Sequence, residues 1–166
     1  MQNIVTQEVL THTPEETQEL ARRVVDVLIA LEQNRGTSTI VALQGDLGAG
    51  KTVFAQGVAR ALGVEGVVTS PTFVVEKVYR LPDGAPWKHL VHIDAYRLTG
   101  EEELHTIGWA DIATDPGNLI LIEWPEQVGM GVPERAYYVR FEEVDEGVRK
   151  LLFNFQFSML QSKFNV

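Results

Sequence analysis

Residues 45–52 constrain the fold of this chain more than any other stretch. They read Gly-Asp-Leu-Gly-Ala-Gly-Lys-Thr and fit the phosphate-binding pattern G-x-x-x-x-G-K-[ST] at every fixed position. The glycines of such a loop let successive backbone N–H groups point inward at a phosphate, the lysine adds a compact positive charge, and the threonine offers a hydroxyl to Mg²⁺. The predicted nucleotide-binding residues are Gly45, Asp46, Leu47, Gly48, Ala49, Gly50, Lys51 and Thr52.

The segments on either side of this loop agree with a phosphate site. The apolar run 40–43 predicts a buried strand that enters the loop. Residues 53–62 predict a helix that leaves it, because Phe54, Val58 and Leu62 recur every four residues on one face. A helix that begins at the loop aims the positive end of its dipole at an anion. An ordinary glycine-rich turn is the alternative, but it would not require both flanking elements.

Size and composition limit the remaining possibilities. The 166 residues are most simply one domain over 1–166, with about 158–166 as a tail. Cysteine is absent, which excludes a disulfide framework or a thiol nucleophile, and the net charge of −9 argues against a broad basic surface for nucleic acid. No signal peptide is recognisable, and the apolar stretch 24–31 is interrupted by Asp26 and too short to cross a bilayer. We therefore expect a cytoplasmic protein.

The rest of the chain predicts alternating helices and strands. Thr13, Pro14 and Glu16 form a helix start with a capping box, and Gly36 is the expected end of that helix. Asp83 and Gly84 mark the turn of a β-hairpin. The further expected elements are strands at 73–81, 87–93, 119–122, 136–141 and 150–157, with short helices at 101–105 and 109–113. This pattern predicts an α/β fold, a three-layer P-loop NTPase-like sandwich whose mixed sheet has a parallel core and antiparallel hairpins.

Two acidic residues end predicted strands and are candidates for the same site. Asp94 follows the run 90–93, and Glu123 follows the run 119–122. Ligands of such sheets bind at the carboxyl ends of the strands, where the phosphate loop also begins. A carboxylate at the tip of a buried strand is costly unless a cation compensates it, and Mg²⁺ with ATP would do so. A helix-capping role or a solvated strand end would be the plainer explanation of each acid.

Other residues near these acids allow more than one interpretation. Thr69, Ser70 and Thr72 lie in a hydroxyl-rich loop that resembles the switch segments of nucleotide-binding proteins, although a Ser-Pro turn that opens a strand would explain it as well. The histidines have no metal-ligand spacing, and His92 is interpreted as structural. Trp124 could pack near a nucleotide or simply fill the core.

Four separated motifs, taken together and in this order, resemble the TsaE family, also called YjeE. They are Gly-Asp-Leu-Gly-Ala-Gly-Lys-Thr at 45–52, Thr-Ser-Pro-Thr-Phe at 69–73, His-Ile-Asp-Ala-Tyr-Arg-Leu at 92–98 and Ile-Glu-Trp-Pro-Glu at 122–126. The first is shared by many nucleotide-binding proteins, and the other three make the resemblance specific. It covers nearly the whole chain, from the capped helix to the last hairpin.

The resemblance implies a function and a set of site residues. Members of this family are weak bacterial P-loop ATPases needed for threonylcarbamoyladenosine in tRNA, and they act with the TsaD–TsaB pair. It implies that Thr52 and Glu123 hold Mg²⁺, that Asp94 lies close to the metal and the γ-phosphate, and that Glu123 orients the attacking water. Lys51, Asp94 and Glu123 are thus the implied catalytic residues. Arg149 resembles the family arginine that reaches the nucleotide from the final hairpin, and tRNA contact is expected to be indirect.

Two other functions remain as alternatives from the sequence. A P-loop small-molecule kinase usually carries an arginine-rich lid, whereas Arg135, Arg140 and Arg149 are scattered. A GTP-dependent switch normally reads guanine with an Asn-Lys-x-Asp segment, and this sequence has none. The slow, partner-regulated ATPase is therefore the first expectation.

Overall fold

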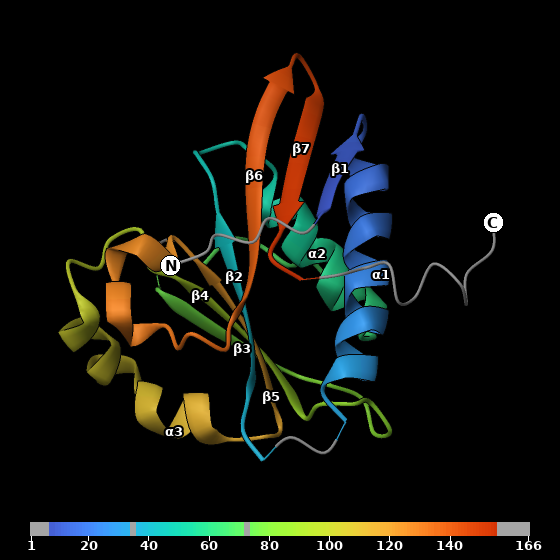
Figure 1. Ribbon diagram of the computed structural model, residues 1–166. Coiled ribbons are helices and arrows are strands. Elements are labelled where there is room, and N and C mark those ends of the chain that lie inside the picture. Colours follow the sequence, from blue (N-terminus) through green and yellow to red (C-terminus); the bar gives the residue numbers. More distant parts are fainter. Residues whose placement is uncertain (1–6, 34–35, 72–73, 156–166) are drawn as a thin grey trace.

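The fold is built on one seven-stranded mixed sheet. The computed structural model describes residues 7–33, 36–71 and 74–155. The strand order is β1-β7-β6-β2-β5-β4-β3 (Figure 1). The strands are β1 (Gln7–Thr11), β2 (Thr39–Gln44), β3 (Glu76–Arg80), β4 (His89–Asp94), β5 (Asn118–Glu123), β6 (Tyr137–Asp145) and β7 (Val148–Phe153). The central pairs β4–β5, β5–β2 and β2–β6 are parallel, whereas β3–β4, β6–β7 and β7–β1 are antiparallel.

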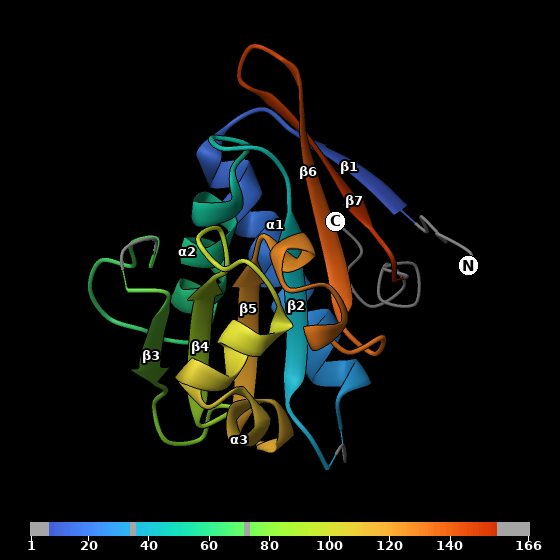
Figure 2. The same ribbon diagram turned by 90° about the vertical axis from the view of Figure 1, so that its left-hand side faces the viewer.

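Helices cover both faces of this sheet. The long helices α1 (Pro14–Leu31) and α2 (Lys51–Ala61) lie together on one face. The opposite face carries η1 (Glu101–Ile107), α3 (Trp109–Thr114) and the short turns η2 (Pro125–Gln127) and η3 (Gly129–Gly131), as Figures 1 and 2 show. The arrangement confirms the predicted three-layer α/β sandwich with a parallel core and antiparallel hairpins.

The alternation of side chains along the central strands divides the core in two. On β2, Val41 and Leu43 pack into the cluster under α1 and α2, whereas Ile40 and Ala42 join the cluster under η1 and α3. β5 divides in the same way, because successive residues of a strand point to opposite faces of the sheet. Both faces are buried, which explains why these strands read as continuous apolar runs.

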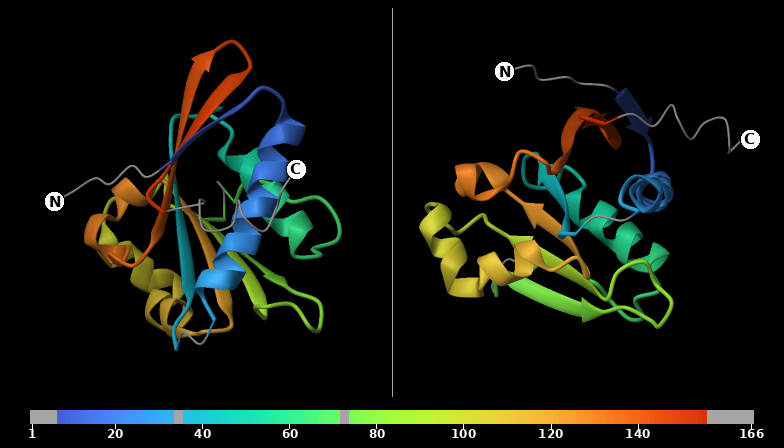
Figure 3. Two further views of the ribbon diagram at one scale, coloured as in Figure 1. Left: turned by 45° about the vertical axis from the view of Figure 1, so that its right-hand side comes forward. Right: turned by 60° about the horizontal axis from the view of Figure 1, so that its bottom comes forward.

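A glycine sets the distance between the two long helices. A Cβ atom added at Gly57 of α2 would lie 2.7 Å from the Cα of Gln18 and 2.8 Å from the Cβ of Ala21, both on α1. The backbones can approach this closely only because residue 57 has no side chain. Figure 3 shows α1 and α2 side by side in two orientations. Among the described residues, no helix is long and apolar enough to cross a membrane.

The start of α1 agrees with the sequence, whereas its end does not. Thr13 accepts a hydrogen bond from the backbone N–H of Glu16 at 3.1 Å, as an N-cap should. The Glu16 carboxylate, however, accepts from the N–H of His12 at 2.6 Å instead of from Thr13, so the expected capping box is displaced by one residue. The helix ends at Leu31, and the expectation that it runs to Gly36 was wrong.

Several strand boundaries differ from the expected ones, and one strand was not predicted. β1 pairs with β7 at the edge of the sheet although its sequence alternates only weakly. β3 begins at Glu76, and the expected strand start at Phe73 lies outside the described residues, as does Thr72. β6 is longer and β7 begins earlier than expected, because Gly147 turns the chain with a φ of 72°. The expected tail at 158–166 also lies outside the described residues.

Candidate nucleotide-binding site

The glycine-rich loop connects β2 to α2 and depends on three glycines with positive φ. Gly45, Gly48 and Gly50 have φ values of 148°, 78° and 107°, which side chains rarely adopt. A Cβ atom at Gly45 would also lie 2.7 Å from the backbone oxygen of Phe141, so the loop rests directly on β6. Gly50 precedes α2 without a side chain to cap it. The first turn of the helix therefore presents its backbone N–H groups toward the cleft beside the loop.

The two predicted acids lie side by side at the carboxyl edge of the sheet. Asp94 and Glu123 are Cα partners at the ends of the parallel strands β4 and β5. Both side chains are buried, with 5% and 2% exposure. They share the face of α2, because Leu90 and Leu121 pack into the core under α2 and lie an even number of residues away.

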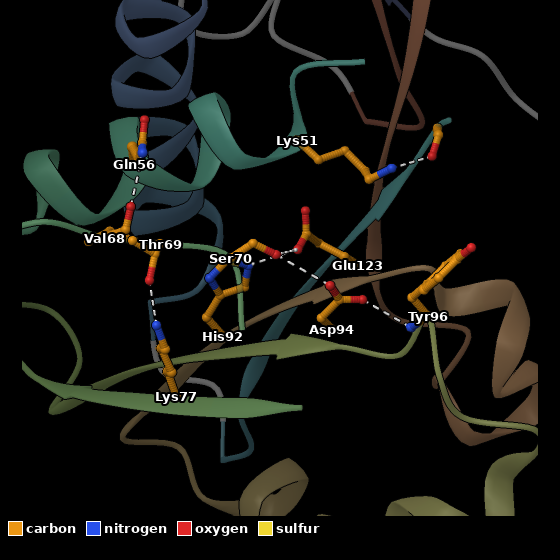
Figure 4. Close-up of polar contacts among 11 residues, drawn as sticks. Lys51, Gln56, Val68, Thr69, Ser70, Lys77, His92, Asp94, Tyr96 and Glu123 are labelled. Carbon is orange, nitrogen blue, oxygen red and sulfur yellow. Dashed lines mark hydrogen bonds and ion pairs between the residues drawn. The ribbon is translucent and has the colours of Figure 1, made fainter. Parts of the chain in front are cut away.

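Ser70 links these two carboxylates. Its hydroxyl donates to Oδ2 of Asp94 at 3.3 Å and lies 3.5 Å from Oε2 of Glu123 (Figure 4). The other oxygen of Asp94 accepts from the backbone N–H of Tyr96 at 2.9 Å. Thr69, the preceding residue of the predicted switch-like loop, instead accepts a hydrogen bond from Lys77 of β3. The loop is thus tied both to the acids and to the edge of the sheet.

Lys51 occupies the centre of a strongly acidic environment. Its ammonium donates to the backbone oxygens of Gly45 and Asp46, the latter at 3.0 Å, and lies 4.3 Å from the ring centroid of Trp124. Burial lowers the pKa of Lys51, because the charged form loses solvent. Four carboxylates oppose this shift by their negative charge. They belong to Glu123, Glu126, Asp94 and Asp46.

These groups open onto one shared cleft of about 190 Å³. The cleft joins the end of the phosphate loop, the start of α2 and the tips of β4 and β5. Its lining residues are Leu47, Gly48, Ala49, Gly50, Lys51, Thr52, Val53, Ser70, Asp94, Glu123 and Trp124. Gly45 and Asp46 line an adjoining hollow between the loop and β6. The structure thus brings the predicted loop residues and both acids to one place.

Arg149 reaches the same loop from the far hairpin. It stands on β7, and its Nη2 lies 3.3 Å from the backbone oxygen of Gly48. Its Nη1 pairs with the Glu143 carboxylate at 2.8 Å. The arginine therefore lies at the tip of the phosphate loop, although it does not line the cleft itself.

A family model described as "Threonylcarbamoyl adenosine biosynthesis protein TsaE" matches residues 11–151. The chain belongs to the TsaE family. The match includes the phosphate loop, both strand-end acids and Arg149.

Curated relatives of the TsaE family carry the name tRNA threonylcarbamoyladenosine biosynthesis protein TsaE. The Streptomyces coelicolor protein is 43% identical over 110 residues, which are 65% of this chain and 66% of that protein. The Mycobacterium tuberculosis protein is 39% identical over 63% of this chain and 64% of its own length. The match thus spans just under two thirds of these two relatives. The Bacillus subtilis protein is 33% identical over 86% of this chain and 82% of its own length.

A solved structure has the same fold. The crystal structure of Bacillus subtilis YdiB superposes with a TM-score of 0.64 at 27% identity, covering 89% of this chain and 83% of that one. The similarity supports the P-loop architecture of this TsaE family member.

Two residues of the cleft region were not assigned to the site from the sequence. His92 is buried on β4, and its Nε2 lies 3.3 Å from Oε2 of Glu123. The sequence could have indicated this placement, because residues two apart on a strand, such as His92 and Asp94, point to the same face of the sheet. Trp124 lines the cleft and packs against Tyr96 with ring centroids 5.0 Å apart. Of its two interpretations from the sequence, this placement favours the one beside the phosphate loop.

Proposed function

We propose that this protein is a slow, Mg²⁺-dependent ATPase that acts as an accessory subunit in threonylcarbamoyladenosine modification of tRNA. The observation that carries the proposal is the convergence of Lys51, Asp94 and Glu123 on one cleft beside the phosphate loop. A phosphate loop alone accounts for binding, whereas hydrolysis also needs groups that hold the metal and orient a water molecule. Membership of the TsaE family supports the biological setting.

The residues around the cleft fit Mg²⁺. The available donors are hydroxyl and carboxylate oxygens, which this hard cation prefers. Within the described ranges no group of three or more His, Cys, Asp or Glu side chains forms a complete metal cage. Mg²⁺ in nucleotide sites is commonly held by one or two protein ligands together with phosphate oxygens and water. Thr52 and Glu123 would be those ligands, and the bound metal would neutralise charge on the β- and γ-phosphates.

Each cleft residue has a distinct task in this proposal. Lys51 would leave the backbone oxygens that it now contacts and place its charge on the β- and γ-phosphates. Glu123 would orient the attacking water, and Asp94, held by Tyr96 and Ser70, would lie next to the metal and the γ-phosphate. The four carboxylates around Lys51 favour a further cation in the cleft, because one ammonium does not balance them.

The partner would be the TsaD–TsaB pair, with tRNA held largely by those subunits. The acidic charge of −9 supports an indirect relation to tRNA, since a polyanion would be repelled by most of the surface. ATP binding and hydrolysis would then regulate the association with the pair and not the chemistry of transfer itself.

An ATPase assay with and without the TsaD–TsaB pair tests this proposal. We expect slow hydrolysis of ATP that needs Mg²⁺ and changes when the pair is added, and a parallel assay with GTP examines base preference. Lys51→Ala should abolish nucleotide binding, whereas Lys88→Ala, which removes an exposed lysine away from the cleft, should not. Glu123→Ala should slow hydrolysis more than binding. Unchanged hydrolysis in a folded Glu123→Ala protein would remove Glu123 from the mechanism.

A further inference from the structure

His92 is a buried imidazole whose side chain makes one hydrogen bond within the part of the chain that the structure describes. It lies under α2 in the interior of the sheet with 1% exposure. Its Nε2 is 3.3 Å from Oε2 of Glu123, and its Nδ1 has no hydrogen-bond partner among the described residues. Burying a polar group costs free energy unless it is hydrogen-bonded, so the contact with Glu123 is what offsets the cost of placing this imidazole in the core.

The chemistry of this contact fixes its direction. An ionised carboxylate only accepts hydrogen bonds, so Nε2 must carry the hydrogen that joins the two groups. In this tautomer Nδ1 carries a lone pair that accepts no hydrogen bond. Leaving that acceptor unused costs less free energy than burying an N–H group at Nδ1 without an acceptor. The arrangement therefore favours an imidazole that donates from Nε2 to Glu123.

This hydrogen bond divides the two oxygens of Glu123 between different tasks. Oε2 accepts from Nε2 of His92 at 3.3 Å and lies 3.5 Å from the hydroxyl oxygen of Ser70. In Figure 4 the other oxygen of Glu123 points away from these two residues, toward the side of the cleft where Lys51 lies. A carboxylate fixed through one oxygen cannot rotate freely, so its second oxygen keeps one direction.

We propose that His92 is a positioning residue that anchors Oε2 of Glu123 and thereby directs its other oxygen at the metal and the attacking water. The inference rests on the function proposed above, because it assigns His92 to the same site. Partners that orient a metal-ligating side chain typically affect activity or metal affinity by about 10- to 100-fold when they are lost. When the hydrogen bond from His92 to Glu123 is removed, we expect kcat to fall by about 10- to 100-fold with little change in ATP affinity.

Two amide substitutions of different length provide the central test. The amide nitrogen of Gln in His92→Gln can take the place of Nε2, whereas that of Asn in His92→Asn corresponds to Nδ1 and stops short of the carboxylate. Both place a similar polar group in the core, so each controls for the folding cost of the other. His92→Gln should retain kcat close to that of the parent, and His92→Asn should lose roughly 10- to 100-fold. Equal kcat values for the two variants would overturn the inference.

Dependence on Glu123 is the second test. In a Glu123→Ala background, the His92→Gln and His92→Asn variants should hydrolyse ATP at the same residual rate, because the residue to be positioned is gone. A second loss of the same size would mean that His92 acts elsewhere. If the parent protein binds ATP but does not hydrolyse it, with or without the TsaD–TsaB pair, the proposed function fails. If the parent hydrolyses ATP and the two amide variants have the same kcat, only the role of His92 fails.

A measurement that needs no activity completes the design. In the ¹⁵N NMR spectrum of the nucleotide-free protein, Nε2 of His92 should carry a proton, and its signal should move in Glu123→Ala. His105, on η1, serves as the internal reference because it stands on the opposite layer of the fold. An Nε2 without a proton, or a signal insensitive to Glu123, would overturn the inference.

Discussion

Replacing Gly57 by alanine should destabilise the protein although alanine is the better helix former. The added Cβ would meet the Cα and the backbone oxygen of Gln18 at 2.7 and 2.8 Å, and the Cβ of Ala21 at 2.8 Å. The closest approach is about 0.7 Å short of the 3.4 Å at which ordinary contact begins. Because backbone atoms make two of these contacts, no rotamer change can relieve them, and α1 and α2 must move apart.

The magnitude follows from two opposing effects. Overpacking of this kind costs about 1–3 kcal/mol, whereas Ala in place of Gly inside a helix returns about 1 kcal/mol. Because the added Cβ would lie 2.7 Å from a backbone atom, the clash belongs to the upper half of the overpacking range, about 2–3 kcal/mol. After the helix-propensity gain we expect the free energy of unfolding to fall by about 1–2 kcal/mol, which corresponds to a Tm lower by about 2–8 °C for a chain of this size.

Thermal and urea unfolding measure this effect. Gly36→Ala is the matched control, because an added Cβ at Gly36 meets no atom within 4 Å and its φ lies outside the left-handed region. That variant should be neutral or gain about 0.4–1 kcal/mol from a less flexible unfolded chain. A Gly57→Ala protein as stable as the parent would refute the reasoning that residue 57 sets the spacing of the helices. Since α2 begins at Lys51, a displaced α2 should also weaken nucleotide binding.

Two further predictions concern stability. Thr13→Ala should lower the free energy of unfolding by about 1 kcal/mol, because it removes the acceptor of the Glu16 N–H. Thr13→Ser, which keeps a hydroxyl acceptor, should retain most of the stability in urea unfolding. Equal losses in the two variants would argue against the N-cap. Burial raises the pKa of Glu76, so the folded state binds a proton more readily than the unfolded state. The free energy of unfolding should therefore fall as the pH rises from the unfolded-state pKa of about 4.5 through the higher folded-state pKa. Glu76→Gln should match the parent below that window and exceed it above, and parallel stability curves for the two proteins from pH 4 to 7 would contradict the prediction.

The central part of the fold was predictable because its signals are local and agree with one another. Residues 40–43 and 119–122 are apolar on both faces, which indicates a strand between two layers, and the confirmed order of strand, glycine loop and helix follows from one motif. Asp94 and Glu123 could be expected together because parallel strands end at the same edge. Their proposed roles stay predictions, as does that of Arg149.

The parts that were missed depend on contacts between distant segments. β1 exists because β7 offers it an edge, and nothing in the residues Gln7 to Thr11 reports the presence of that edge. Gly36 was expected to end α1, but the helix stops at Leu31, where its apolar face also stops contacting the core. The link between His92 and Glu123 joins residues on different strands, so only the register of β4 against β5 brings them together.

The pairing of β1 with β7 joins the beginning of the described chain to the phosphate loop. Thr11 is the Cα partner of Arg149, and its hydroxyl is hydrogen-bonded to that of Thr17 at 2.7 Å. Arg149 in turn contacts the backbone oxygen of Gly48. Deleting β1 would leave β7, the strand that carries this arginine, without its outer neighbour in the sheet. Changes within Gln7–Thr11 would therefore not be neutral for measurements at the loop.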